Sequence, residues 1–264
     1  MTFYTVDDTG RQRSVEIKVG NERIVHGRQQ MLTDSKERTL YERAVALLAD
    51  ADVFGVAAVE DTRGTPLYDG ATSLMPDARS IAVVGVEVFP EVVGLVEPQR
   101  QMGEVSANDL YPPHLDYLNG RLNRAIYDLA KVYRGAGYRA LPLPSLGTPN
   151  DARFMRGILS FKHAGEYAGL GKIGRSSLLI TPQFGPRARL ACLLTNAEMP
   201  STRRAIENPC ASCPDLCVAN CPAGALAAPA AGQPYAINKF ACSTFRQAAG
   251  LCATCVSVCL AGAR

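Results

Sequence analysis

The cysteines are the feature that most constrains this chain. The first of the nine is Cys192, and the other eight lie between Cys210 and Cys259. Four of them stand within the stretch CASCPDLCVANCP, which ends at Pro222. This uneven placement indicates two parts: a body, residues 34–200, and a cysteine-dense tail, residues 201–264.

The composition sets the redox environment of these thiols. The 264 residues suffice for one sizeable core with a small appended module, and a formal net charge of +3 gives no reason to expect a nucleic-acid partner. The N-terminal stretch MTFYTVDDTGRQR lacks the apolar segment of a secretory signal, and no uncharged apolar run is long enough to span a membrane. We therefore expect a cytoplasmic protein with no membrane contact, in which thiols are reduced and disulfides explain clustered cysteines poorly.

The spacing of the tail cysteines favours iron–sulfur clusters over zinc. Structural zinc needs four thiolate or imidazole ligands, commonly as two CxxC-type pairs, whereas the tail has no histidine and its first group alone has four cysteines. That group is one residue longer, near Pro214, than the bacterial ferredoxin run C-x2-C-x2-C-x3-C-P. Zinc and a purely structural cysteine array remain as alternatives.

The eight tail cysteines equal the ligand count of two 4Fe–4S clusters. In ferredoxins the fourth cysteine of the run binds the other cluster. By that rule the first cluster is expected to take Cys210, Cys213, Cys217 and Cys259. The second is expected to take Cys221, Cys242, Cys252 and Cys255. Cys192 lies in a predicted strand, and we expect it to be a small buried side chain.

The body has the pattern of a mixed α/β domain. Alternation over residues 14–31 around Gly20-Asn21 predicts a β-hairpin, and Asp34 with Glu37 resembles a capping box that opens a helix. Apolar periodicity predicts a long helix from Pro113 to Gly135. The other expected elements are strands over 53–59, 80–89, 138–143, 177–180 and 187–194, a helix over 159–168, and a linker over 200–209.

The stretch AGLGKIGRSSLLI, residues 168–180, contains the pattern GxGxxG. A dinucleotide site would need a strand before these glycines and a helix after them, and the order here is reversed, which argues against that reading. A helix end and tight turn would use one or two of the glycines. Three glycines in six residues indicate in addition that the backbone approaches something large and flat.

This glycine turn, continued as TPQFGPRARLACLLTN and followed by the cysteine tail, resembles the epoxyqueuosine reductase and reductive dehalogenase group over roughly residues 75–264. The resemblance implies an α+β fold: a nitroreductase-like mixed α/β body over 34–200 and a ferredoxin-like module with two 4Fe–4S clusters over 201–264. Residues 1–33 would form an N-terminal β-hairpin extension.

The resemblance also implies a cofactor and a reaction. A corrinoid (cobalamin), held base-off, would receive electrons from a cluster and reduce a substrate. Its contacts would come from Gly169, Leu170, Gly171, Lys172, Gly174 and Arg175. Epoxyqueuosine reductases carry an acidic proton donor shortly before the glycine turn. The matching position here falls near Met155, with Asp151 the nearest carboxylate. They also continue into a helical repeat region, whereas this sequence ends at Arg264, so we expect a substrate other than epoxyqueuosine.

His163 is the candidate acid, because its ordinary pKa lies near neutrality. On a helix Ser160, His163 and Tyr167 share one face, which would make them a small catalytic donor cluster. The competing interpretation makes His163 a packing or capping residue and Tyr167 a core aromatic. Tyr111, just before the long helix, is a candidate for the mouth of a pocket.

Three functions remain open. The first is a cobalamin-dependent reductase of an unidentified small-molecule substrate. The second is an electron-transfer or corrinoid-reducing protein without a substrate of its own, and the third is a variant that binds FMN. A low-potential donor such as ferredoxin or flavodoxin would supply the electrons. Residues 1–33 would cover the pocket or form a homodimer contact.

Overall fold

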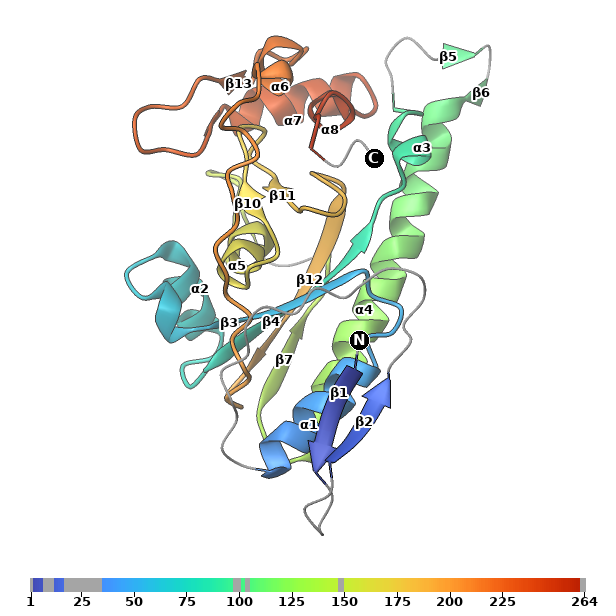
Figure 1. Ribbon diagram of the computed structural model, residues 1–264. Helices are drawn as coiled ribbons and strands as arrows, with labels where there is room; N and C mark the ends of the chain where they lie inside the picture. Colours follow the sequence, from blue (N-terminus) through green and yellow to red (C-terminus); the bar gives the residue numbers. More distant parts are fainter. Residues whose placement is uncertain are drawn as a thin grey trace.

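The computed structural model describes residues 2–6, 12–16, 35–96, 101–102, 105–146 and 150–261 (Figure 1). Its centre is a four-stranded antiparallel sheet in the order β3-β4-β12-β7. The strands are β3 (Val53–Ala58), β4 (Ser80–Glu87), β12 (Ala188–Thr195) and β7 (Ala140–Leu143). All four were expected from their apolar runs, and the predicted α+β class is confirmed.

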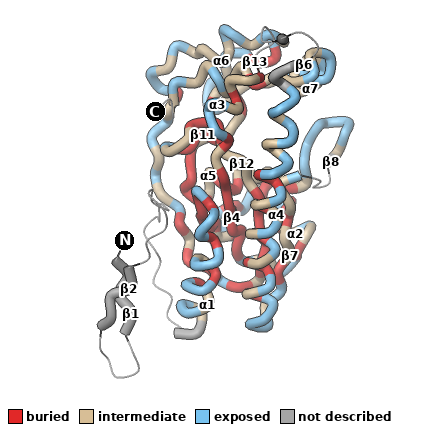
Figure 2. The backbone as a smooth tube through the Cα atoms, turned by 90° about the vertical axis from the view of Figure 1, so that its right-hand side faces the viewer, coloured by how far each residue is buried: buried red, intermediate tan, exposed pale blue. Residues whose placement is uncertain are grey.

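Helices cover both faces of this sheet, as the predicted central strands require. One face packs on α1 (Ser35–Ala46) and α4 (Tyr111–Gly135), with Phe54, Val84 and Leu193 pointing toward them. The other packs on α2 (Pro66–Leu74) and α5 (Phe161–Tyr167). Side chains alternate between the faces along each strand, so every central strand is buried on both sides (Figure 2).

The long helix α4 confirms the predicted apolar stripe. Leu118, Leu122, Ile126, Leu129 and Tyr133 are buried in the core, and the helix ends at Gly135 as expected. Ala44 in α1 and Leu48 in the turn after it are buried as predicted, whereas Leu47 is half exposed. The helix α2 was not expected, because PLYDGATSL buries only Leu67, Gly70 and Ala71 and has little apolar periodicity.

The described part of the N-terminus forms a two-stranded hairpin. Strands β1 (Thr2–Val6) and β2 (Gln12–Glu16) pair antiparallel, with Phe3 opposite Val15. Residues 14–16, at the start of the predicted hairpin, thus pair with β1, and the predicted turn at Gly20-Asn21 lies outside the described residues.

The remaining elements are short. In the body they are η1 (Glu60–Thr62), α3 (Pro90–Val93), β5 (Gln101–Met102), β6 (Val105–Ser106), η2 (Ala107–Leu110), β8 (Asn150–Asp151), β9 (Arg156–Gly157), β10 (Lys172–Ile173) and β11 (Leu179–Ile180). In the tail they are α6 (Leu216–Ala219), β13 (Leu226–Ala227), β14 (Ala236–Ile237), α7 (Lys239–Ala248) and α8 (Thr254–Ser257). No helix among the described residues is long and apolar enough to cross a membrane.

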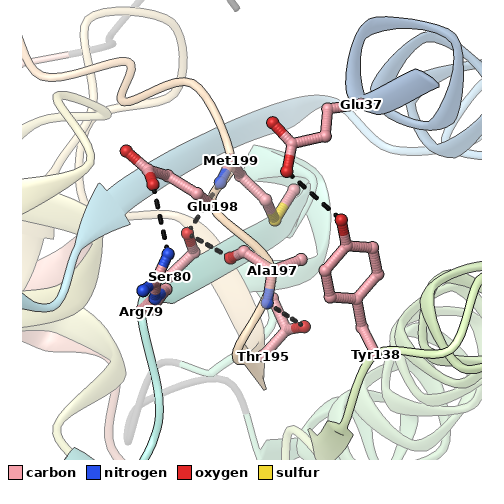
Figure 3. Close-up of polar contacts among 8 residues, drawn as sticks. All are labelled: Glu37, Arg79, Ser80, Tyr138, Thr195, Ala197, Glu198 and Met199. Atoms are coloured by element: carbon pink, nitrogen blue, oxygen red, sulfur yellow. Dashed lines mark hydrogen bonds and ion pairs between the residues drawn. The ribbon is translucent and has the colours of Figure 1, made fainter. Parts of the chain in front are cut away.

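The chain leaving β12 is tied back onto the sheet (Figure 3). Ser80 Oγ donates to the carbonyl of Ala197 at 2.9 Å and accepts from the amide of Met199 at 2.9 Å. Beyond this point the predicted linker is anchored to the edge strand β3. The amide of Thr202 donates to Val56 O at 2.9 Å, and Thr202 Oγ1 accepts from Val56 N at 2.7 Å and donates to Ala168 O at 2.6 Å. The start of the linker is thus part of the body.

Replacing Thr202 with valine is expected to destabilise the body by about 1–3 kcal/mol, because Val56 N–H and Ala168 C=O lose a buried partner. The matched control is Thr72→Val, whose hydroxyl bonds only to carbonyls of its own helix, with an expected cost below about 0.5 kcal/mol. Urea unfolding followed by circular dichroism measures both. Equal effects of the two substitutions would contradict the anchoring role.

Candidate functional site

The tail has little apolar core. Between Cys210 and Ala261 the only buried residues are Cys210, Ala225, Leu226 and Ala253. The helices α6, α7 and α8 contain no buried residue. A segment of this size that buries so few side chains needs a cross-link or a bound metal to hold its shape.

The first predicted set of thiols lies together. Burial raises the pKa of Cys217, on α6, and the neighbouring thiols of Cys210, Cys259 and Cys213 raise it further. Burial likewise raises the pKa of Cys259, and the thiols of Cys210 and Cys213 raise it further. A hydrogen bond with the Ala261 amide lowers it. These four residues come from both ends of the tail, so the fold brings Cys259 back to the first run.

The second predicted set is also grouped. Burial raises the pKa of Cys255, on α8, to about 12, with contributions from Cys252, Cys242, Cys217 and Cys221. For Cys242, on α7, burial raises the pKa, Arg246 lowers it, and the thiols of Cys221 and Cys252 raise it. The Cys217–Cys255 interaction shows that the two sets are neighbours, and α6 packs against α8.

A single-ion site is not formed by these thiols. Among the described residues no three His, Cys, Asp or Glu side chains come together closely enough to hold one metal ion. A 4Fe–4S cluster binds each thiolate through a different iron, so its four sulfurs lie further apart than the ligands of one zinc ion. The grouping is therefore compatible with clusters and does not favour the zinc alternative.

A cavity of about 300 Å³ lies where the tail meets the body; we call it the junction cavity. The tail contributes the four thiols of the second set: Cys221, Cys242, Cys252 and Cys255. The body contributes Tyr111, which the sequence analysis had placed at a pocket mouth, and two stretches, residues 176–178 and 186–189. The second set of thiols thus faces the body directly.

The glycines of the turn are covered by the chain itself. A Cβ on Gly171 would stand 2.4 Å from Ile180 O, and one on Gly169, whose φ is +70°, would stand 2.7 Å from Thr202 O. A Cβ on Gly174 would meet Ile180 Cδ1 at 2.2 Å. The absence of a side chain at these glycines therefore lets neighbouring segments of the chain pack closely, and the expectation that the turn also contacts a flat cofactor stays a prediction.

The other residues of the turn have structural partners. Leu170 is buried in the core, and Lys172 forms an ion pair with Glu166 at 3.3 Å. Arg175 pairs with Asp215, which lies in the tail between Cys213 and Cys217. The amide of Arg175 also donates to Cys210 Sγ at 3.5 Å. The turn therefore docks the first group of thiols onto the body.

The predicted donor cluster is only partly assembled. Ser160 Oγ and His163 Nδ1 are hydrogen-bonded at 2.7 Å. Tyr167 instead lies under the guanidinium of Arg203, 5.4 Å from its ring centre, beside a separate groove. Burial and the charge of Lys162 lower the pKa of His163, so its imidazole is neutral at pH 7. A neutral imidazole is a weaker acid than the one expected from the sequence.

Lys162 makes more polar contacts than its neighbour His163. Its Nζ donates to Ser177 O at 2.6 Å and to Ser177 Oγ at 2.7 Å, and lies 4.5 Å from the ring centre of Tyr235 in the tail. Burial lowers its pKa to about 8, and the charge of Lys239 acts in the same direction. The lysine thereby holds Ser177, whose φ is +65°, at the wall of the junction cavity.

Asp151, the carboxylate nearest to the expected acid position, is paired with an arginine. Asp151 forms a two-fold hydrogen-bonded pair with Arg153, at 3.0 and 2.9 Å. The bonds from Arg153 keep the pKa of Asp151 below its ordinary value. It is exposed and ionised, which does not suit a proton donor at neutral pH.

Part of this chain is similar in sequence to known proteins. No protein-family model matches the chain. A segment of 70 residues, 26% of this chain, is 40% identical to epoxyqueuosine reductase of Bacillus anthracis. A match of the same length to the Bacillus cereus protein is 39% identical. The predicted resemblance to the epoxyqueuosine reductase and reductive dehalogenase group is confirmed.

Solved structures of this group extend the likeness along most of the chain. A catabolic reductive dehalogenase in complex with 3-bromo-4-hydroxybenzoic acid superposes with a TM-score of 0.58 at 18% identity, over 84% of this chain and 32% of that one. Epoxyqueuosine reductase from Bacillus subtilis superposes with a TM-score of 0.51 at 20% identity, over 86% of this chain and 66% of that one. At these identities the likeness shows a shared fold.

The chain spans only part of its relatives. The segment matched in sequence is 18% of the length of the two Bacillus proteins. Another epoxyqueuosine reductase of the same fold, with a TM-score of 0.51 at 19% identity over 86% of this chain and 65% of that one, was solved with a tRNA stem loop. That ligand belongs to that protein, and the expectation of no nucleic-acid partner for this chain stays a prediction.

Proposed function

We propose that this chain is an iron–sulfur oxidoreductase whose tail holds two 4Fe–4S clusters and passes their electrons to a corrinoid for a reductive reaction. The observation that carries the proposal is the grouping of the eight tail thiols. They fall into the two sets of four that ferredoxin-type ligation requires, and the second set faces the body across the junction cavity. A low-potential ferredoxin or flavodoxin is the proposed electron donor.

The chemistry of the tail fits the clusters. Eight thiols supply the ligands, and a segment with four buried residues gains its rigidity from bonds to metal. On this basis we propose the division into a nitroreductase-like body, residues 34–200, and a ferredoxin-like module, residues 201–264. Arg175 with Asp215, and Lys162 with Tyr235, are the contacts that fix one part on the other.

The corrinoid has weaker support in the residues. When bound, it would supply a strongly reducing cobalt centre. The turn from Gly169 to Arg175 packs on the chain itself, so the body surface available near the second set of thiols is made by residues 176–178 and 186–189. Burial lowers the pKa of His163, which is hydrogen-bonded to Ser160, so the protonated form that could act as an acid is less populated at pH 7 than in an ordinary histidine.

A second candidate is favoured by the covered glycines. An electron-transfer protein needs the clusters and an exposed face, and does not need a deep pocket over the glycine turn. In the described part of the chain the pocket beside Gly171 is a groove lined by Glu166, Tyr167, Lys172 and residues 203–206. The flavin variant of the same fold is the third candidate.

Electron paramagnetic resonance tests the proposal. The chain is purified without oxygen, cob(II)alamin is added, and spectra are recorded before and after dithionite. We expect a base-off cob(II)alamin signal that appears only with the protein and vanishes as reduced-cluster signals grow. Cluster signals beside an unchanged cobalamin spectrum would support the electron-transfer candidate instead. Fluorescence of the heat-extracted supernatant would reveal FMN.

A further inference from the structure

Arg189 is an incompletely neutralised cation in the wall of the junction cavity. It is the second residue of β12, and it is partly buried. Among the described residues, Nε donates to Asn119 Oδ1 at 3.0 Å, a neutral amide, and no carboxylate lies within ion-pair distance of the guanidinium. Asp116 acts on the guanidinium from a greater distance and Arg246 opposes it, so the charge is offset only in part and an anion in the cavity would stabilise it.

The neighbouring Arg187 shows the contrast. It lines the same cavity and is buried, but it forms an ion pair with Glu87 at 3.1 Å. Arg187, the residue just before β12, and Arg189 therefore have different counter-charges. In the part of the cavity wall that the body provides, Arg189 keeps positive charge available, and Arg246 of α7 adds a second cation from the tail.

Other polar groups at this wall point to the same need. Tyr111 lies next to Arg189 and close enough to Cys255 for the two to affect each other electrostatically. Ser176, 5% exposed, lines the cavity, and its Oγ is buried without a hydrogen-bond partner. A cation, a phenol and an unpaired hydroxyl thus surround the space that the four thiols of the second set enter.

We propose that Arg189 tunes the cluster held by Cys221, Cys242, Cys252 and Cys255, making it easier to reduce. The inference rests on the proposed clusters. A 4Fe–4S cluster with four thiolate ligands is an anion, and it becomes more negative when it accepts one electron, with no bond formed or broken. A nearby cation in a poorly solvated site stabilises that added charge and raises the reduction potential.

This difference in charge would favour electron transfer from the first cluster to the second. The first cluster lies on the side of the Arg175–Asp215 pair, where the two charges offset each other. The second faces the body, where the charge of Arg189 has no such partner. An electron entering at the first cluster is therefore held preferentially on the second, next to the place where the body must use it.

A redox titration of the oxygen-free full-length protein, followed by electron paramagnetic resonance, tests this role. In Arg189→Met one of the two cluster midpoints is expected to fall while the other stays in place. Arg189→Lys, which keeps the charge, is expected to titrate like the wild type. Arg124→Met removes an exposed cation of α4 that does not line the cavity, and neither midpoint should move.

Iron and sulfide analysis separates the possible failures. Two clusters in Arg189→Met with both midpoints unchanged would overturn the inference and leave the proposed function intact. A wild-type protein without iron would remove the proposed function itself. If the methionine variant loses a cluster, Arg189→Gln, which keeps hydrogen-bond donors and removes only the charge, is titrated in its place and has to show the same fall.

Discussion

Replacing Cys217 and Cys259 together with alanine is expected to remove one cluster and leave the other intact. The iron content should fall from about eight to about four atoms per chain. The two residues are far apart in the sequence, yet the pKa of each is raised by the thiols of Cys210 and Cys213, so both are assigned to the same cluster. Iron and sulfide analysis, with spectra of the dithionite-reduced protein, measures the result.

A second pair of substitutions makes this prediction specific. Cys217→Ala with Cys255→Ala takes one ligand from each proposed cluster and is expected to perturb both cluster signals. Ligation without crossover would instead make the two double variants alike, because Cys217 and Cys259 would then belong to different clusters and replacing both would also damage both clusters. The two double variants thus decide between the two ligand assignments.

Cys192→Ala is the matched control. Cys192 is fully buried in β12, as the sequence predicted, and burial raises the pKa of its thiol well above the ordinary value. Its substitution is expected to cost about 1 kcal/mol of stability and to leave the iron content unchanged. Loss of iron in this variant would show that the body thiol takes part in ligation.

The parts of the fold that could be predicted are those with a periodic pattern. The strand β4 is a continuous run of branched apolar residues, and α4 repeats its apolar residues every three to four positions, so both were located correctly. The pairing of residues 14–16 with β1 was not foreseen, because alternation identifies a strand but not its partner. Thr202 gave no signal, since its buried role depends on hydrogen bonds to Val56 and Ala168, which are distant in sequence.

The candidate site could likewise be predicted only in part from the sequence. Spacing and count gave an assignment of the tail thiols to two clusters, which stays a prediction; the structure places Cys259 near Cys217, as that assignment expects. Helical spacing placed Ser160 next to His163, but it could not foresee that Arg203 would take Tyr167 to another face. Arg189 was not singled out, because an arginine in a strand becomes informative only once its missing counter-charge is known.

Gly171→Ala is expected to destabilise the protein by about 2–4 kcal/mol. The added Cβ would stand 2.4 Å from the carbonyl oxygen of Ile180 and 2.8 Å from its carbon, so backbone has to move. Gly174 and Arg175 lie in the turn between β10 and β11 and contact Cys210. The change should therefore also loosen the first cluster. Urea unfolding and the iron content report the two effects.

Gly120→Ala provides the control. Gly120 lies inside α4, and nothing stands within 4 Å of a Cβ added there. Alanine at this position is expected to stabilise the protein by up to about 1 kcal/mol, because glycine is the poorer helix former. If Gly171→Ala instead unfolds like the wild type and loses only corrinoid binding, the glycine serves the cofactor and not the packing of the turn. That result would favour the turn as part of the corrinoid site.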